Sequence, residues 1–108
     1  MTVPPYLSAL GLTVAVEVPV VVALYPGQRL RLGAICCVAT TLTHALLFLV
    51  LFRFVALTSW TLVLAESGAL VAEAVAYAAA SRPRSMPRGL MASALANAAS
   101  FGLGLLVL

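Results

Sequence analysis

Four long apolar runs separated by short polar turns fill almost the whole chain. The runs cover about residues 6–24, 33–52, 57–80 and 89–108. A helix needs about 20 apolar residues to cross the hydrocarbon core of a bilayer, which is roughly 30 Å thick. Each run has about that length, and the turn at Tyr25, Pro26 and Gly27 cannot continue a helix. The pattern therefore predicts an all-α, polytopic membrane protein, with four transmembrane helices in one bundle and a single domain over residues 1–108.

The composition agrees with this pattern. The chain has 108 residues, 64% of them hydrophobic and 8% charged, whereas soluble domains carry about 25% charged residues. Four spans leave no room for a separate soluble domain. The first run has no basic segment before it and no cleavage site after it, so we expect a retained helix rather than a signal peptide. The sequence contains no glycine-rich phosphate loop, and we expect no cofactor.

The positions of the arginines predict the orientation. The chain has six arginines and no lysine, which gives a formal net charge of +3. The first and third turns hold Arg29, Arg31, Arg82, Arg84 and Arg88, and only Arg53 lies near the second turn. Because basic residues stay on the cytoplasmic side, we expect loops 25–32 and 81–88 to be cytoplasmic and both termini to face outward. The expected location is the cytoplasmic (inner) membrane, where lipid headgroups rather than nucleic acid meet the arginines.

Four ionisable side chains lie inside the apolar runs. They are all three acidic residues, Glu17, Glu66 and Glu73, together with the single histidine, His44. A charged side chain at the centre of a bilayer costs about 2.5–3.5 kcal/mol on insertion scales. Such residues face the interior of a bundle and mark polar sites. The sequence therefore predicts a polar cluster buried among the helices.

Helical spacing gives each run one polar face. Counted from the cytoplasmic end at 1.5 Å per residue, Glu17, Glu73 and Asn97 lie at about 10–12 Å. His44 and Ser100 lie at about 16–17 Å, and Glu66 at about 21 Å. The polar faces contain Thr40, Thr43 and His44 on the second run, Glu66, Glu73 and Tyr77 on the third, and Ser93, Asn97 and Ser100 on the fourth. Faces of this kind are satisfied when they turn toward one another.

The preferred functional interpretation is a site that binds or translocates a proton, a cation or a small cationic solute. We expect Glu17 and Glu73 to accept protons, and Glu66 and His44 to form a deeper relay. Asn97 and Ser100 would orient them, and Tyr77 lies one turn beyond Glu73. Two carboxyl groups at close range in low dielectric do not both ionise readily, so we expect at least one to be protonated.

Two other interpretations stay open. In the first, the polar network only holds the helices in register, with each hydrogen bond worth about 0.6–2 kcal/mol, and the chain is an accessory or scaffold subunit of a larger membrane complex. In the second, the chain is an intramembrane metal-dependent enzyme, although it has no H-E-x-x-H helix, and we expect no metal site. An enzymatic function is the less favoured interpretation.

Two further patterns bear on partners. Adjacent Cys36 and Cys37 could bind a soft metal, but buried cysteines act more often as small apolar residues. Small residues recur at four-residue intervals on the third and fourth runs, at Gly68, Ala72, Ala76 and Ala80, at Ala94, Ala98 and Gly102, and at Ala92, Ala96, Ser100 and Gly104. Such rows allow close helix packing, either inside one bundle or between copies in a homo-oligomer.

The polar pattern also resembles an uncharacterised group of short four-helix bacterial membrane proteins. The residues that carry the resemblance, over the whole chain, are Glu17, Thr43, His44, Glu66, Glu73, Ser93, Asn97 and Ser100. That group shows Asn-x-x-Thr-His-Pro in its second helix, where this chain has Thr40 in place of Asn and Ala45 in place of Pro. The resemblance implies a four-helix fold and no particular activity.

Overall fold

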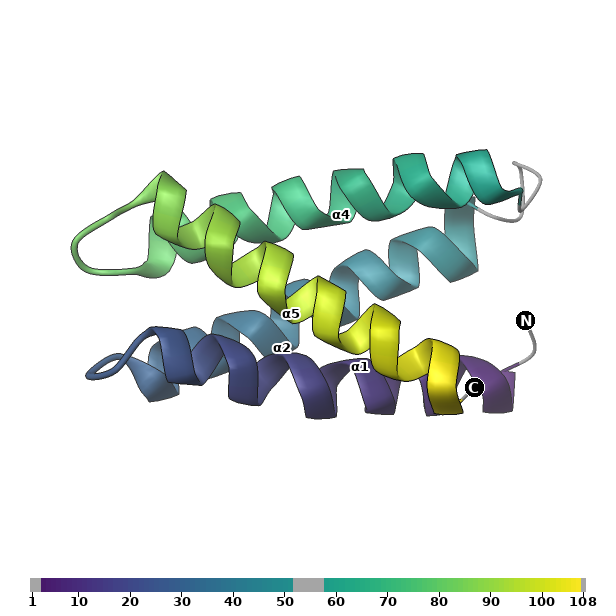
Figure 1. Ribbon diagram of the computed structural model, residues 1–108, viewed down its shortest axis with the longest axis horizontal. Helices are drawn as coiled ribbons and strands as arrows, with labels where there is room; N and C mark the ends of the chain where they lie inside the picture. The colour runs from purple at the N-terminus through teal and green to yellow at the C-terminus, as the bar shows by residue number, and fades with distance from the viewer. Residues whose placement is uncertain (1–2, 52–57, 108) are drawn as a thin grey trace.

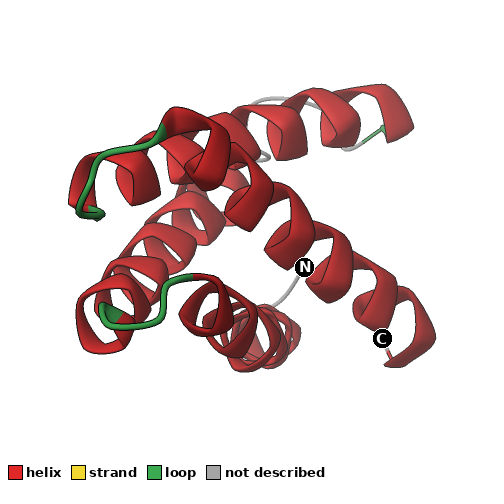
Figure 2. Ribbon diagram, turned by 60° about the vertical axis from the view of Figure 1, so that its left-hand side comes forward, coloured by secondary structure: helices red, strands yellow, loops and turns green. Residues whose placement is uncertain are grey.

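The computed structural model describes residues 3–51 and 58–107 of the chain, and all regular structure in these ranges is helical (Figure 2). The helices are α1 (Val3–Leu24), α2 (Arg29–Ala45), α4 (Ser59–Ala80) and α5 (Met86–Val107). A π-helical segment, η1 (Leu46–Leu51), continues α2. The all-α prediction is confirmed, and the four long helices match the four apolar runs.

Three helices begin earlier than the apolar runs predict, and the first of them is α1, which contains Val3 although its run begins near residue 6. Helix α2 begins at Arg29 rather than near residue 33, and α5 begins at Met86 rather than near residue 89. Hydropathy marks the apolar part of a helix, whereas backbone hydrogen bonding continues into polar first turns. Pro87 fits the first turn of α5 because the amide groups there have no helical acceptor. Helix α4 begins where Thr58 and Thr61 cap its N-terminus reciprocally, with hydrogen bonds of 2.8 and 3.1 Å.

The four long helices form a closed ring in which each contacts two neighbours. Contacts join α1 to α2, α2 to α4, α4 to α5, and α5 back to α1. Helix α2 runs obliquely from α1 at one end of the bundle to α4 at the other, and α5 runs from α4 to α1 (Figure 1). Residues one turn apart on α2 or α5 can therefore face different neighbours. This geometry positions the polar side chains described below.

One end of the bundle carries the two loops with the arginines, and both chain termini lie at the opposite end (Figure 1). The side chain of Gln28 holds the two loops together. Its amide nitrogen donates to the carbonyl of Arg82 at 2.9 Å, and its carbonyl oxygen accepts from the Arg82 backbone amide at 2.6 Å. Arg88 donates to the Leu24 carbonyl at 2.6 and 3.1 Å and lies over the Tyr25 ring at 4.7 Å. We call this end the arginine end.

The two helical hairpins follow one plan. When the last residues of α1 and α4 are aligned, the first residues of α2 and α5 fall within one position of each other. We call residues that align in this register equivalent.

The helices of each hairpin pack closely at equivalent glycines, Gly33 on α2 and Gly89 on α5. A Cβ atom on Gly33 would lie 3.2 Å from the side chain of Val22. One on Gly89 would lie 3.3 Å from the Cβ of Ala78, the residue equivalent to Val22. Both contacts are tight, so the repeat extends from the helix bounds to the packing inside each hairpin.

Three of the helices are long and apolar enough to cross a membrane. The segments are Leu7–Leu24, Arg29–Leu49 and Trp60–Ala80. Helix α5 is not among them over the residues that the structure describes. The bundle is 39 Å long, which exceeds the roughly 30 Å of a hydrocarbon core. Large apolar side chains such as Leu42 and Leu64 are exposed on its outer surface, which is the pattern of helices surrounded by lipid.

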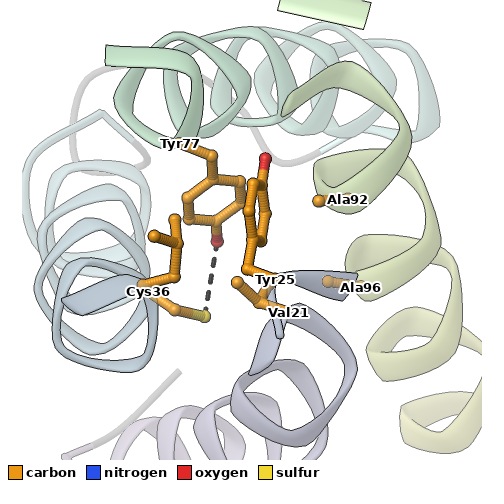
Figure 3. Close-up of a cluster of buried hydrophobic side chains, with 7 residues drawn as sticks. Val21, Tyr25, Cys36, Tyr77, Ala92 and Ala96 are labelled. Atoms are coloured by element: carbon orange, nitrogen blue, oxygen red, sulfur yellow. Dashed lines mark hydrogen bonds between the residues drawn. The ribbon is translucent and has the colours of Figure 1, made fainter. Parts of the chain in front are cut away.

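The apolar core lies toward the arginine end and is small. Its buried members come from all four helices or their ends: Val21, Tyr25, Leu32, Cys36, Tyr77, Ala92 and Ala96 (Figure 3). The row that contains Ala92, Ala96 and Ser100 is therefore buried inside this bundle. The row through Ala94, Ala98 and Gly102 faces outward, whereas the row through Gly68 is exposed at Gly68 and Ala72 but packs against the core at Ala80.

Candidate functional site

A cavity of about 210 Å³ lies among the four long helices and η1. Six of the seven side chains predicted from the sequence line it: Glu17, His44, Glu66, Glu73, Asn97 and Ser100. The structure thus brings together residues that are as much as 83 positions apart in the chain. Tyr77 does not line the cavity and belongs to the core beside it.

Glu17 on α1 has both carboxyl oxygens in hydrogen bonds. Thr40 on α2 donates to Oε1 at 3.0 Å, and Ser100 on α5 donates to Oε2 at 2.7 Å. The Glu17 side chain is only 1% exposed. A buried carboxyl group without partners is costly, so these two donors are what allow Glu17 to occupy this position.

Glu73 on α4 also has both carboxyl oxygens in hydrogen bonds, although its donors are not the residues equivalent to those of Glu17. Asn97 on α5 donates to Oε1 at 2.8 Å, and Thr43 on α2 donates to Oε2 at 2.9 Å. The Asn97 amide also donates to the carbonyl of Ser93 at 2.8 Å, which holds the amide against its own helix. Ser93 in turn donates to the Leu70 carbonyl at 2.7 Å. A second, fixed set of donors therefore supports Glu73.

The oblique paths of α2 and α5 explain why each carboxyl group receives one donor from each of these helices. Thr40 lies where α2 passes α1 and reaches Glu17, and Thr43, about one turn later, reaches Glu73 on α4. On α5 the order is reversed, since Asn97 reaches Glu73 and Ser100 reaches Glu17. The spacing between the two donors is the same on both helices.

The two supported carboxyl groups also follow the repeat of the hairpins. Glu17 on α1 and Glu73 on α4 are equivalent residues in the register that aligns these two helices. Each hairpin therefore contributes one carboxyl group to the cavity from the same position. The pair is a consequence of the repeated plan of the fold.

Glu66 and His44 lie in another part of the cavity wall, together with the aromatic rings of Phe48 and Phe101. The His44 ring is 4.8 Å from the Phe48 ring, centroid to centroid. Glu66 and Asn97 also line a second, more open hollow of about 320 Å³ between α4 and α5. Glu66 breaks the repeat, because its equivalent on α1 is an apolar leucine.

The electrostatic environment of the cavity is set by three carboxyl groups. Glu17, Glu66 and Glu73 all line it. The arginines of the described residues lie at the arginine end, and none of them lines the cavity. Within the described residues, no three His, Cys, Asp or Glu side chains group closely enough to hold a metal ion.

No protein-family model, curated protein or solved structure matches the chain. The functional argument therefore rests on the geometry of the cavity and of the bundle around it.

The donors on α2 are the part of the site that sequence reasoning missed. Thr40 and Thr43 were recognised as a polar face, but they were not assigned to the carboxyl groups. Their spacing, matched by that of Asn97 and Ser100, is the signal that could have assigned them.

Cys36 and Cys37 do not act as a pair. Cys36 is buried and contacts Thr40 and Tyr77, whereas Cys37 is half-buried. Adjacent residues on a helix point in different directions, so the two sulfur atoms do not face one site. The pair therefore offers no support for a soft-metal site.

Proposed function

We propose that the chain is a four-span protein of the cytoplasmic membrane whose cavity binds or translocates protons or small cations. Helix α5 is the fourth span, and loops 25–32 and 81–88 face the cytoplasm. Five arginines at the arginine end support this orientation by the positive-inside rule. Arg53, the one arginine predicted near the other side, lies outside the described residues.

The observation that carries the proposal is the paired arrangement of Glu17 and Glu73. Each of their four oxygens accepts one hydrogen bond from a side chain, and the two carboxyl groups line one cavity with Glu66. Carboxyl groups held close together repel one another when ionised. A proton or a cation in the cavity relieves that repulsion, and so the site favours a positively charged occupant. Buried ionisable groups of this kind mark ion and proton pathways in membranes.

The size of the cavity limits the occupant. A volume of about 210 Å³ is enough for a hydrated inorganic cation or a small organic ammonium ion, since one water occupies roughly 30 Å³ in the liquid. The wall combines carboxyl oxygens with the rings of Phe48 and Phe101. Aromatic faces attract organic cations as well.

The experiment is flux across proteoliposomes that contain the purified protein. We expect a pH gradient to drive proton or cation flux above that of empty vesicles, and Glu73→Gln to abolish most of it. The matched control is Thr41→Ala, because Thr41 lies next to Thr40 but faces outward. Equal flux in the wild type, in Glu73→Gln and in empty vesicles would reject the proposal.

One observation favours a second function. The hydrogen bonds of Glu17 and Glu73 together join all four long helices, as expected of a network that only fixes helix packing in an accessory subunit. That function predicts that Glu73→Gln lowers stability and that the purified protein supports no flux. Association with a larger membrane complex or with a second copy belongs to this alternative.

A further inference from the structure

A chain of side-chain contacts leaves the cavity toward the arginine end. Thr40 donates to Glu17 at 3.0 Å, the Thr40 oxygen lies 3.8 Å from the Cys36 sulfur, and the Tyr77 hydroxyl lies 3.3 Å from the same sulfur. The contact between Tyr77 and Cys36 is drawn in Figure 3. The four side chains come from α1, α2 and α4, and each is at most 2% exposed. The chain of contacts is therefore continuous and shielded from lipid.

The number of protons on each group fixes the direction of these contacts. Thr40 has one hydroxyl proton, and it is donated to Glu17. The contact between Thr40 and Cys36 must then use the thiol proton of Cys36, so Tyr77 must supply its own hydroxyl proton to the sulfur. Every donor thus points the same way, from Tyr77 toward the Glu17 carboxyl group.

The chain of contacts exists in only one of the two hairpin positions. The residues equivalent to Cys36 and Tyr77 are Ala92 and Val21, whose side chains have no protons to exchange. Both are fully buried in the same core. Cys36 and Tyr77 therefore depart from the repeat in a coordinated way, on the path that ends at Glu17.

Tyr77 is the member of the path nearest to the arginine end. It lies one helical turn, about 6 Å along the helix, before Ser81, the C-cap of α4, which is itself fully buried. The Tyr25 ring packs beside Tyr77 (Figure 3) and is itself fully buried. The path is closed by one aromatic layer at that point, whereas its other end opens into the cavity.

We propose that Tyr77, Cys36 and Thr40 form a proton relay that loads Glu17 from the arginine end of the bundle. This inference rests on the proposed function of the cavity and adds its route of proton access. A hydronium ion that passes the Tyr25 ring gives its proton to the Tyr77 oxygen and leaves as water, while the hydroxyl proton of Tyr77 passes to the Cys36 sulfur. The thiol proton passes to the Thr40 oxygen, and the Thr40 proton passes to the Glu17 carboxylate. Each relay group keeps one hydrogen, one O–H bond forms on Glu17, and no electrons are transferred.

The test uses reconstituted protein and a pulse of protons released by light. The infrared absorption of the protonated carboxyl C=O bond then gives the rate at which the carboxyl groups gain a proton. The part of the C=O signal that disappears in the Glu17→Gln variant is the part that belongs to Glu17. We expect Cys36→Ala and Tyr77→Phe to slow this protonation roughly tenfold or more while leaving its final amplitude unchanged. Cys36→Ser keeps a proton and a lone pair at this position, and we expect it to restore the rate.

Each variant has a matched control in the same part of the fold. Cys37→Ala removes the neighbouring thiol, and Tyr25→Phe removes a hydroxyl that has no hydrogen-bond partner among the described residues. We expect both to leave the rate unchanged. A wild-type rate in Cys36→Ala and Tyr77→Phe, with full amplitude, overturns the relay and leaves the proposed function intact. The absence of any Glu17 signal in the wild type overturns both.

Discussion

Ser100 on α5 donates a 2.7 Å hydrogen bond to Glu17 on α1, although the two residues lie near opposite ends of the chain. The partner carboxyl group, Glu73, receives its α5 donor from Asn97, one turn before Ser100. One helix thus supports both carboxyl groups, because it crosses from α4 to α1 as it leaves the arginine end (Figure 1). Helix α2 does the same with Thr40 and Thr43, in the opposite order.

This arrangement predicts that the Ser100–Glu17 contact contributes to stability. We expect Ser100→Ala to lower the free energy of unfolding in detergent by about 0.6–2 kcal/mol, because Glu17 loses one of its two donors. A double-mutant cycle that combines Ser100→Ala with Glu17→Gln should give a large coupling energy. A control cycle that combines Ser100→Ala with Thr41→Ala, whose side chain faces outward, should give a much smaller one. Equal couplings would contradict the contact.

The glycines offer a test of the packing between hairpin helices. A Cβ atom on Gly89 would lie 2.5 Å from the Ala74 carbonyl oxygen, whereas one on Gly102, on the same helix, would meet nothing within 4 Å. We expect Gly89→Ala to destabilise the protein by about 1–3 kcal/mol. Gly102→Ala should be neutral or slightly stabilising, since alanine favours a helix. Thermal unfolding of both variants in one detergent makes the comparison.

Tyr25 predicts a stabilising substitution. Its hydroxyl is buried and has no hydrogen-bond partner among the described residues, and burial raises the pKa of the phenol, so it stays neutral. Because an unsatisfied buried polar group costs about 1–3 kcal/mol, we expect Tyr25→Phe to raise the unfolding free energy by about 1 kcal/mol or more. The stack on Arg88 remains, since phenylalanine keeps the aromatic face. A loss of stability would show that the hydroxyl has a partner.

The hydrogen bonds between the two loops at the arginine end predict that a substitution there changes only the local stability of these loops. Gln28 makes two hydrogen bonds to the Arg82 backbone across the two loops. We expect Gln28→Ala to increase amide hydrogen exchange in residues 25–32 and 81–88 and to leave exchange near Glu73 unchanged. Increased exchange throughout the bundle would instead show that the two loops support the whole fold.

The sequence predicted the helices and the members of the cavity wall for a clear physical reason. Polar residues such as Glu17 and Asn97 cannot face lipid without cost, so helical spacing alone turns them inward. Their exact partners could not be predicted, because those depend on the oblique paths of α2 and α5, which hydropathy does not encode. Tyr77 shows the limit most clearly. It shares a face with Glu73, yet its hydroxyl reaches Cys36 outside the cavity.

Two other features were beyond sequence reasoning. The π-helical segment Leu46–Leu51 follows α2 directly and has no pattern that separates it from an ordinary helix. The sequence also does not show which row of small residues is buried, because packing decides this. The row through Ala92 and Ala96 faces the core, whereas Gly102 faces outward.

The central claim is that the carboxyl pair is a site for a positive charge and does more than hold the helices together. The most direct measurement compares flux and unfolding free energy for Glu73→Gln in the same preparation, with Thr41→Ala as control. Glutamine keeps an oxygen that can accept from Thr43 or Asn97 but cannot take up a proton at neutral pH. We predict a large loss of flux with a change in stability of no more than about 2 kcal/mol. Unchanged flux in a folded Glu73→Gln protein would contradict the account.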